Sequence, residues 1–185
     1  LFDDCGGLGF IDLDNPREAK PVSISGVTHQ GIGELSGLKH IADNRYGVKF
    51  NIDGADWVYE GLFDENALKM ELSIVLVGQG VLSNGVLEHI SYDKASGNFA
   101  LSFSTATSPT QIFTIEGQDR KLIQHTRERT LNISEELLSA GEDASFISHD
   151  GLRSSARLYL PNESLGFETP YPLVYYIHGG PQSQE

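Results

Sequence analysis

The sequence predicts a mainly β fold, and three observations indicate it. Short apolar or alternating runs of strand length fill most of residues 1–130. Gly, Asn, Asp or Pro residues separate these runs at a spacing of roughly 10 residues, as in repeated antiparallel hairpins. After about residue 143 the pattern changes, and Leu173–His178 is a continuous apolar run, typical of a strand buried on both faces. We therefore expect a sandwich, barrel or propeller, followed by the opening of an α/β sheet.

The first half of the chain contains three strand-like regions. The run Leu8–Leu13 leads into an Asp-Asn-Pro turn, and the run Leu72–Gly80 is β-branched and ends in glycines. Between them, Asp53-Gly54 divides the stretch Gly47–Phe63 into two strands, because this dipeptide favours tight hairpins. Trp57 and Tyr59 lie two residues apart, so we expect them to share one face of a strand and to pack in the core.

The clearest alternation lies in the next hairpins. Phe99, Leu101 and Phe103 alternate with small or polar residues, as a half-buried strand requires. A Ser/Thr/Pro turn follows, and then the strand QIFTI, the turn EGQD and the strand KLIQHT. No exact internal repeat is present, so periodicity alone does not choose among sandwich, barrel and propeller.

A linker helix of one or two turns is expected at a domain boundary near residues 130–143. Asn132 can cap it, Glu135 stands three residues later as in a capping box, and Gly141 provides a C-terminal stop. The following stretch, Ala144–Pro161, predicts two strands joined at Asp150-Gly151. After a proline-flanked loop, Leu173–His178 reads as a strand buried on both faces.

Composition limits the function. The chain has 185 residues, 39% of them hydrophobic and 21% charged, which is typical of a globular protein. Its formal net charge of −13 would repel phosphate backbones and anionic lipids, so we expect neither nucleic acid nor membrane as a partner. Cys5 is the only cysteine, which excludes an internal disulfide and a cysteine-rich zinc site. We expect no metal, no cofactor and a cytoplasmic location.

The motif with the most specific chemistry is His178-Gly179-Gly180-Pro181. A strand that ends in His-Gly-Gly presents backbone N–H groups without Cβ hindrance, which suits the oxyanion of a tetrahedral intermediate. Loops of this type follow the third strand of α/β-hydrolases. An ordinary Gly-Gly-Pro turn at a strand end is the alternative, and the tetrapeptide alone does not decide between them.

The surrounding sequence resembles the prolyl oligopeptidase family of serine peptidases, in particular its acylaminoacyl-peptidase-like branch. The resemblance rests on SFISHDGLRSSARLYLP, a loop, and YPLVYYIHGGPQSQ, over about residues 144–185. Upstream, FALSFSTATSPTQIFTI is similar to a blade of the family's β-propeller. The resemblance implies C-terminal propeller blades over residues 1–135, a linker with a short helix over 136–143, and a truncated α/β-hydrolase domain over 144–185.

The resemblance also implies site residues and a substrate. The Gly180 N–H would help to bind the oxyanion, while His178, Gly179 and Pro181 would shape the loop. His178 would not be the catalytic base, because the family's base lies near the C-terminus. A peptide or acyl-peptide substrate is implied. The chain contains no catalytic residues, so the Ser-His-Asp triad is expected after Glu185 and the chain alone is expected to be inactive.

Two sequences look like catalytic motifs but do not fit. Gly33-Glu-Leu-Ser36-Gly37 places the serine fourth, not third, and so does not match a nucleophile elbow. Ser148-His149-Asp150 places the triad residue types side by side, where alternation along a strand prevents the required hydrogen-bond chain. The other histidines show no metal-ligand spacing (His29, His40, His89 and His125).

Two other functions stay open. A non-catalytic β-rich binding module would explain the hairpins and treat His178–Pro181 as a turn. An esterase or lipase with a β-rich N-terminal domain would share the oxyanion loop. If the chain is an internal piece of a peptidase, the strand Leu173–His178 lacks its parallel neighbours and should leave an exposed apolar edge.

Overall fold

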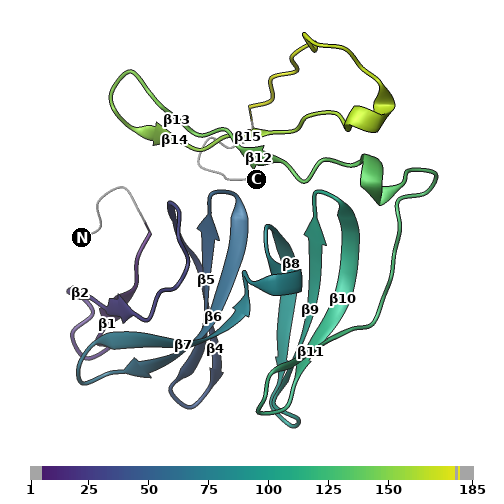
Figure 1. Cartoon of the computed structure of the whole chain (residues 1–185). Coiled ribbons are helices and arrows are strands. Elements are labelled where there is room, and N and C mark those ends of the chain that lie inside the picture. The colour runs from purple at the N-terminus through teal and green to yellow at the C-terminus, as the bar shows by residue number, and fades with distance from the viewer. Residues whose placement is uncertain (1–5, 178, 180–185) are drawn as a thin grey trace.

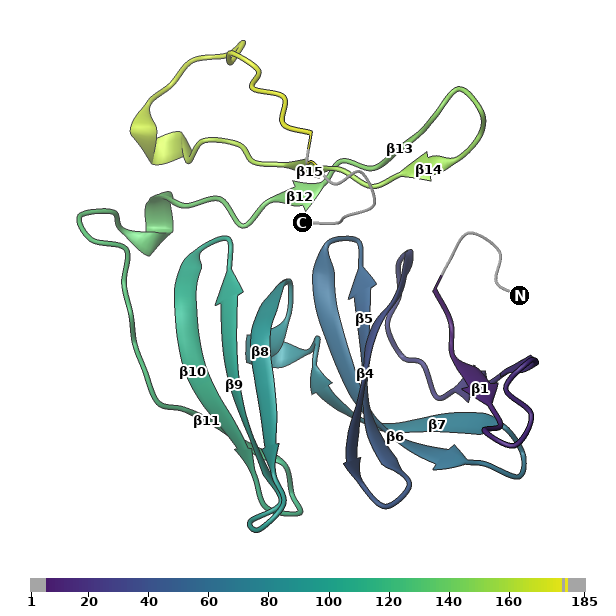
Figure 2. The ribbon, with the colours of Figure 1, turned by 180° about the vertical axis from the view of Figure 1, so that it is seen from behind.

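The computed structural model describes residues 6–177 and 179, and it confirms that the chain is mainly β (Figure 1). Two larger sheets stand side by side, and a C-terminal segment passes across one end of both sheets (Figures 1 and 2). The described residues form no α-helix, only three short 3-10 turns. None of these turns has the length or apolar character needed to span a bilayer.

The first sheet has the strand order β3-β7-β6-β5-β4. Neighbouring strands are antiparallel except for β3, which pairs in parallel with β7. A separate hairpin of β1 and β2 precedes it. The strand bounds are β1 (Gly9–Ile11), β2 (Ala19–Pro21), β3 (Ser23–Ser25), β4 (Gly33–Ala42), β5 (Arg45–Ile52), β6 (Ala55–Asp64) and β7 (Lys69–Val77).

The second sheet is an antiparallel meander in which each strand pairs with the next in sequence. A 3-10 turn, η1 (Gly80–Leu82), connects it to the first sheet. Its strands are β8 (Gly85–Asp93), β9 (Asn98–Thr105), β10 (Ser108–Glu116) and β11 (Lys121–Gln124). The first sheet contains the same kind of four-stranded meander in β4–β7, so two similar units follow one another along the chain.

Alternating side chains explain where the strands form. Phe99, Leu101 and Phe103 on β9 are only 2–3% exposed, which confirms the predicted half-buried strand. The tight hairpin at Asp53-Gly54 is also confirmed, because both residues have positive φ (49° and 84°), as a two-residue type I′ turn requires.

Two hydrophobic clusters stabilise the sheets. The larger cluster lies between them and includes Ile41 and Val58 of the first sheet with Leu87, Phe103 and Phe113 of the second. The smaller cluster covers the opposite face of the first sheet. It contains Leu8, Val48, Phe50, Ile52, Tyr59, Met70 and Leu72. Trp57 stacks on Tyr59 with ring centroids 6.0 Å apart, which confirms that these residues share one strand face.

Buried charges also join the two sheets. The Glu60 carboxylate on β6 accepts hydrogen bonds from Arg45 of the same sheet and from Arg120 at the β10–β11 turn. Asp56 pairs with Lys49 at 3.0 Å and accepts a 2.7 Å hydrogen bond from the Leu87 N–H of β8. The contact between the sheets is therefore both apolar and ionic.

One turn forms within the region predicted for a one- or two-turn linker helix, but the predicted cap at Asn132 and stop at Gly141 are wrong. Only one 3-10 turn forms, η2 (Glu135–Leu137), and the residue before it is Ser134 rather than Asn132. Asn132 adopts positive φ (62°), a conformation that ends regular structure instead of starting a helix. No side chain caps the turn, and Leu138 follows it rather than Gly141. An isolated segment this short gains too few hydrogen bonds to propagate a helix.

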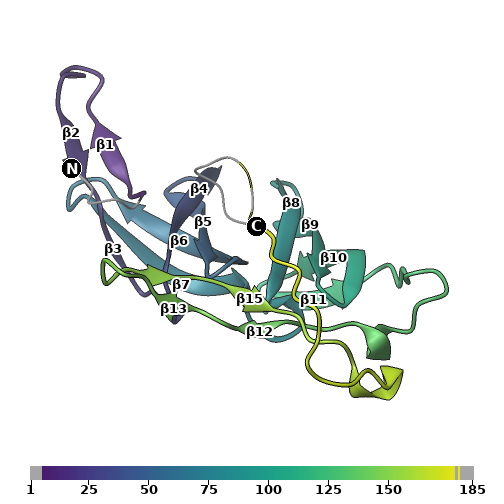
Figure 3. The same ribbon diagram turned by 90° about the horizontal axis from the view of Figure 1, so that it is seen from above.

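The C-terminal segment consists of short elements (Figure 3). These are β12 (Glu142–Asp143), β13 (Phe146–Ile147), β14 (Arg153–Ser154), β15 (Arg157–Leu158) and the 3-10 turn η3 (Glu163–Leu165). β13 and β14 pair across the turn at Asp150-Gly151, which confirms the predicted hairpin, and β12 pairs with β15. The described part of the segment contains no parallel strands, so the predicted opening of an α/β sheet is not formed here.

The predicted strand Leu173–His178 does not form within the described residues. Residues Leu173–Ile177 have no regular structure, and their side chains are 72–89% exposed. His178 lies outside the described residues. A strand buried on both faces needs a neighbour on each side, and no described strand pairs with this stretch. The stretch is exposed, but it does not form the strand edge that was expected.

Candidate functional site

The predicted oxyanion loop is only partly described. Gly179 is exposed, and a Cβ added to it would meet no atom within 4 Å. Residues His178, Gly180 and Pro181 lie outside the described residues. The role predicted for the Gly180 N–H therefore stays a prediction.

The residues of the two rejected motifs do not assemble into a catalytic site. Ser36 lies in β4, where its hydroxyl is 3.5 Å from the Lys49 carbonyl oxygen. Ser148 Oγ does lie 3.3 Å from His149 Nδ1, a contact that strand alternation alone did not predict. However, Asp150 accepts its hydrogen bond from the Leu152 N–H, and no contact of the described residues joins it to His149.

The described histidines and acids form no metal site. No group of three or more His, Cys, Asp or Glu among residues 6–177 and 179 has the geometry to hold a metal ion. His29 packs against the rings of Phe50 and Trp57, and its Nδ1 lies 2.9 Å from the Tyr59 hydroxyl. Burial lowers the pKa of His29, so its neutral form is favoured in this aromatic cluster.

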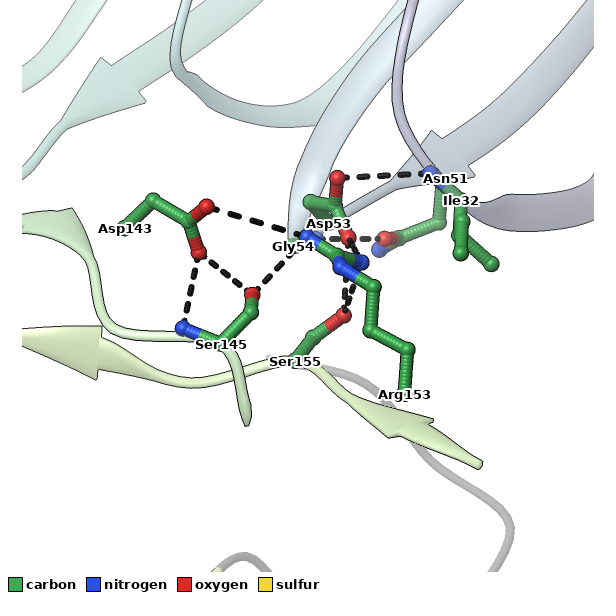
Figure 4. Close-up of polar contacts among 8 residues, drawn as sticks. All are labelled: Ile32, Asn51, Asp53, Gly54, Asp143, Ser145, Arg153 and Ser155. Carbon is green, nitrogen blue, oxygen red and sulfur yellow. Dashed lines mark hydrogen bonds and ion pairs between the residues drawn. The ribbon is translucent and has the colours of Figure 1, made fainter. Parts of the chain in front are cut away.

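The most developed polar site joins the C-terminal segment to the first sheet (Figure 4). Arg153, on β14, donates a 2.6 Å hydrogen bond from Nη1 to Asp53 Oδ1 at the tip of the β5–β6 hairpin. Ser155 Oγ donates to the same oxygen at 2.7 Å. These partners are about a hundred residues apart in the chain, so the contact fixes the two regions against each other. We call these residues, with Asp143 and Ser145, the hairpin clamp.

Local structure holds Asp53 in place. The Ile32 N–H donates to Asp53 Oδ2 at 3.3 Å, which leaves Oδ1 for the partners from the C-terminal segment. The Asn51 side chain accepts the Gly54 N–H at 3.1 Å and so closes the turn. Only glycine fits at position 31, because a Cβ added there would lie 2.5 Å from Asp53 Oδ2. The hairpin therefore presents its carboxylate in a fixed direction.

The other side of the Arg153 guanidinium faces the β12 strand. Nη2 donates to Ser145 Oγ at 2.8 Å and lies 3.8 Å from Asp143 Oδ2. The Ser145 hydroxyl and its backbone N–H both donate to Asp143 Oδ1. Arg153 thus lies between two carboxylates, one from each region of the molecule, as Figure 4 shows.

The clamp is charged at neutral pH. Partial burial of Asp53 opposes its ionisation, but hydrogen bonds from Arg153, Ser155 and the Ile32 N–H outweigh it and hold the Asp53 pKa below its usual value. Hydrogen bonds from Ser145 likewise lower the Asp143 pKa, and the bond to Asp53 raises the Arg153 pKa. All three shifts favour the charged forms of the clamp residues. The clamp is therefore best described as an ionic contact between two regions of the chain.

Sequence reasoning missed the clamp. It assigned Asp53 to a tight turn, which is correct, and gave Arg153 no role. A two-residue turn with an acidic first residue is a local signal, but nothing local indicates which distant cation will meet it. The contact becomes visible only once the C-terminal segment is placed over the hairpin.

Comparison with known proteins gives a fold-level match. No family model and no curated protein matches the chain. Among solved structures, 31 chains match. One is a prolyl endopeptidase from a study of inter-domain dynamics in catalysis and specificity, with a TM-score of 0.54 and 15% sequence identity. The match covers 80% of this chain and 20% of that chain, so this chain spans about a fifth of that enzyme's length.

The likeness is one of fold. It agrees with a β-propeller portion in a mainly β chain. At this level of identity, the chain is similar to part of a prolyl endopeptidase in fold alone.

Proposed function

We propose that the chain is part of a serine peptidase of the prolyl oligopeptidase type. Residues 1–135 would belong to its β-propeller, residues 136–143 to the linker, and residues 144–185 to the start of its catalytic domain. The strands β4–β7 and β8–β11 would be two consecutive blades. The substrate would be a short peptide or acyl-peptide, and the propeller would restrict access to the active site.

One observation carries this proposal. Two consecutive four-stranded antiparallel meanders pack face to face through a shared apolar cluster, which is how propeller blades stack. The fold likeness to a prolyl endopeptidase is independent support. The C-terminal segment lies across one end of both meanders, a position suited to the start of a domain that covers a propeller (Figures 1 and 3).

In the proposed enzyme the chain contributes part of the oxyanion hole. The Gly180 N–H would donate to the oxyanion, and His178, Gly179 and Pro181 would shape the loop around it. The serine, histidine and aspartate of the triad would come from residues after Glu185. The exposed run Leu173–Ile177 would become a central strand once its neighbouring strands are present.

The proposal is tested on the native protein purified from its source. A fluorophosphonate probe should label one serine, and the protein should hydrolyse short peptide or acyl-peptide substrates. Replacing Gly180 by Pro in that protein removes the N–H and should lower kcat by about 10²–10³-fold. The matched control, Gly179→Ala, keeps both backbone donors and should have a much smaller effect.

Three results would change part or all of the proposal. Absence of both labelling and hydrolysis would favour a binding module, whose core between the two sheets needs no residue after β11. Rapid hydrolysis of simple esters without hydrolysis of peptides would favour an esterase. Unchanged kcat in Gly180→Pro would remove Gly180 from the oxyanion hole while leaving the peptidase assignment in place.

A further inference from the structure

A cavity of about 180 Å³ opens between the two sheets, outside the hairpin clamp and the predicted oxyanion loop. Its floor is the buried apolar cluster between the sheets. Its lining includes Ile41, Val58, Leu76, Ile90, Tyr92 and Phe99. The cavity is open to solvent and its exposed lining is mainly apolar, which is typical of a small-ligand pocket. The cavity is therefore suited to one branched or aromatic side chain.

Two glycines create the space. In the β4–β5 register, Gly37 lies opposite Lys49 and Gly47 lies opposite Lys39, so each lysine faces a residue without a side chain. Directly opposed residues share one face of an antiparallel sheet. A Cβ added at Gly47 would meet only the Lys39 carbonyl oxygen at 3.8 Å and Ile41 Cδ1 at 4.0 Å, so larger residues have room there. The absence of side chains at Gly37 and Gly47 thus contributes to the space of the cavity.

The two lysines differ in their partners. Lys49 is neutralised by Asp56 at 3.0 Å. Lys39 is exposed, and its ammonium donates to the Ile90 carbonyl oxygen at 2.9 Å. No carboxylate among the described residues lies within ion-pair distance of Lys39. An ammonium group has three N–H donors, and the bond to Ile90 uses one of them, so the other two are available to an external carboxylate beside the cavity.

We propose that this cavity binds the C-terminal residue of a peptide, with its apolar side chain in the cavity and its terminal carboxylate on Lys39. This proposal rests on the proposed peptidase function, which supplies peptides as ligands, and it specifies a preference for peptides that end in Leu- or Phe-sized residues. The ligands that the cavity would accept all carry a carboxylate close to a branched or aromatic apolar group.

The test is an NMR titration of the ¹⁵N-labelled chain with three probes. Acetyl-Ala-Leu carries the carboxylate and the side chain, its C-terminal amide lacks the charge, and 4-methylpentanoate lacks the peptide group. The proposal expects saturable shifts at Gly37, Gly47 and Ile90 with acetyl-Ala-Leu, and weaker binding of both other probes. Equal affinities for the acid and the amide would overturn it, as would shifts confined to other residues. Equal binding of 4-methylpentanoate would overturn the assignment to a peptide.

Two variants make the test specific. Lys39→Met keeps the apolar stem and should weaken binding of acetyl-Ala-Leu by about fivefold without changing binding of the amide. Its control is Lys69→Met, because Lys69 is an exposed lysine near Glu71 and does not line this cavity. Gly47→Val should abolish binding by filling the space, whereas Gly9→Val on β1 should not. Unchanged binding in Lys39→Met overturns the proposal even if Gly47→Val does not fold.

Failure here and failure of the proposed function are distinguishable. The titration uses this chain, whereas serine labelling uses the native protein. If the probe labels the native protein but acetyl-Ala-Leu does not bind this chain, the peptidase assignment stands and the cavity is not a peptide site.

Discussion

The paired sheets and the C-terminal segment are stabilised in different ways. Between β4 and β11, strands of up to ten residues enclose two apolar clusters and several buried charges. From residue 125 to residue 177 no side chain is buried, and the ladders are two residues long. The segment contacts the first sheet through the hairpin clamp rather than through an apolar core.

The difference shows that apolar sequence alone does not bury a segment. Phe99, Leu101 and Phe103 are 2–3% exposed because β9 lies between β8 and β10 and faces the other sheet. Leu173–Ile177 is just as apolar, but these residues are 72–89% exposed because no described strand pairs with them. Burial depends on neighbours, and these come from elsewhere in the fold.

The largest expected effect comes from making the same substitution in both regions. Phe103→Ala removes a ring from the cluster between the sheets and should lower the free energy of unfolding by about 3–5 kcal/mol. Phe167→Ala, at a residue 63% exposed, should change it by less than about 0.5 kcal/mol. Urea denaturation measures both. Similar losses for the two variants would break the comparison.

A smaller effect is expected from the buried charges that join the sheets. Glu60→Gln leaves Arg45 and Arg120 without their shared carboxylate and should cost about 3 kcal/mol. The control is Glu71→Gln, because Glu71 is exposed and its pair with Lys69 is worth less than about 1 kcal/mol. If urea denaturation shows no difference between the variants, the sheets are joined by apolar packing alone.

A change in the hairpin clamp should act locally rather than globally. Asp53→Asn removes the charge that Arg153 contacts, so amides of residues 142–158 should exchange faster while those of β8–β11 stay unchanged. Asp150→Asn serves as the control, because Asp150 lies on the β13–β14 hairpin that carries Arg153 and its carboxylate accepts the Leu152 N–H rather than a donor of the first sheet. Slower exchange, or equal protection in both variants, would show that the clamp does not hold the segment.

The smallest effect is a pH dependence of the same contact. Because the Asp53 pKa is lowered in the folded chain, its stabilising contribution is present above the unfolded value and is lost as pH falls through the folded value. The contact should therefore weaken below about pH 4. An NMR titration of the Ser155 amide should show this transition in the wild-type chain and not in Asp53→Asn. A transition near neutral pH would contradict the assignment.

Much of the sheet structure was predictable from sequence, because its signals are local. The alternation at Phe99–Phe103, the Asp53-Gly54 turn and the Asp150-Gly151 turn each depend on a few neighbouring residues, and each forms as expected. The helix cap predicted at Asn132 is wrong, because a capping box without a packed apolar face does not sustain a helix.

The candidate sites were less predictable because they depend on distant partners. The Asp53–Arg153 contact and the cavity opposite Gly37 and Gly47 arise only when separate elements meet. The oxyanion role of Gly180 depends on a family resemblance, and it stays a prediction because Gly180 lies outside the described residues.

The central claim is that the two meanders are propeller blades of a longer serine peptidase. The most direct test is the intact mass of the native protein from its source, with the reading frame followed past Glu185. The account predicts a protein several hundred residues longer, with a Gly-x-Ser-x-Gly sequence after a later strand. A natural stop at or near Glu185 would contradict it and leave a β-rich binding module as the better account.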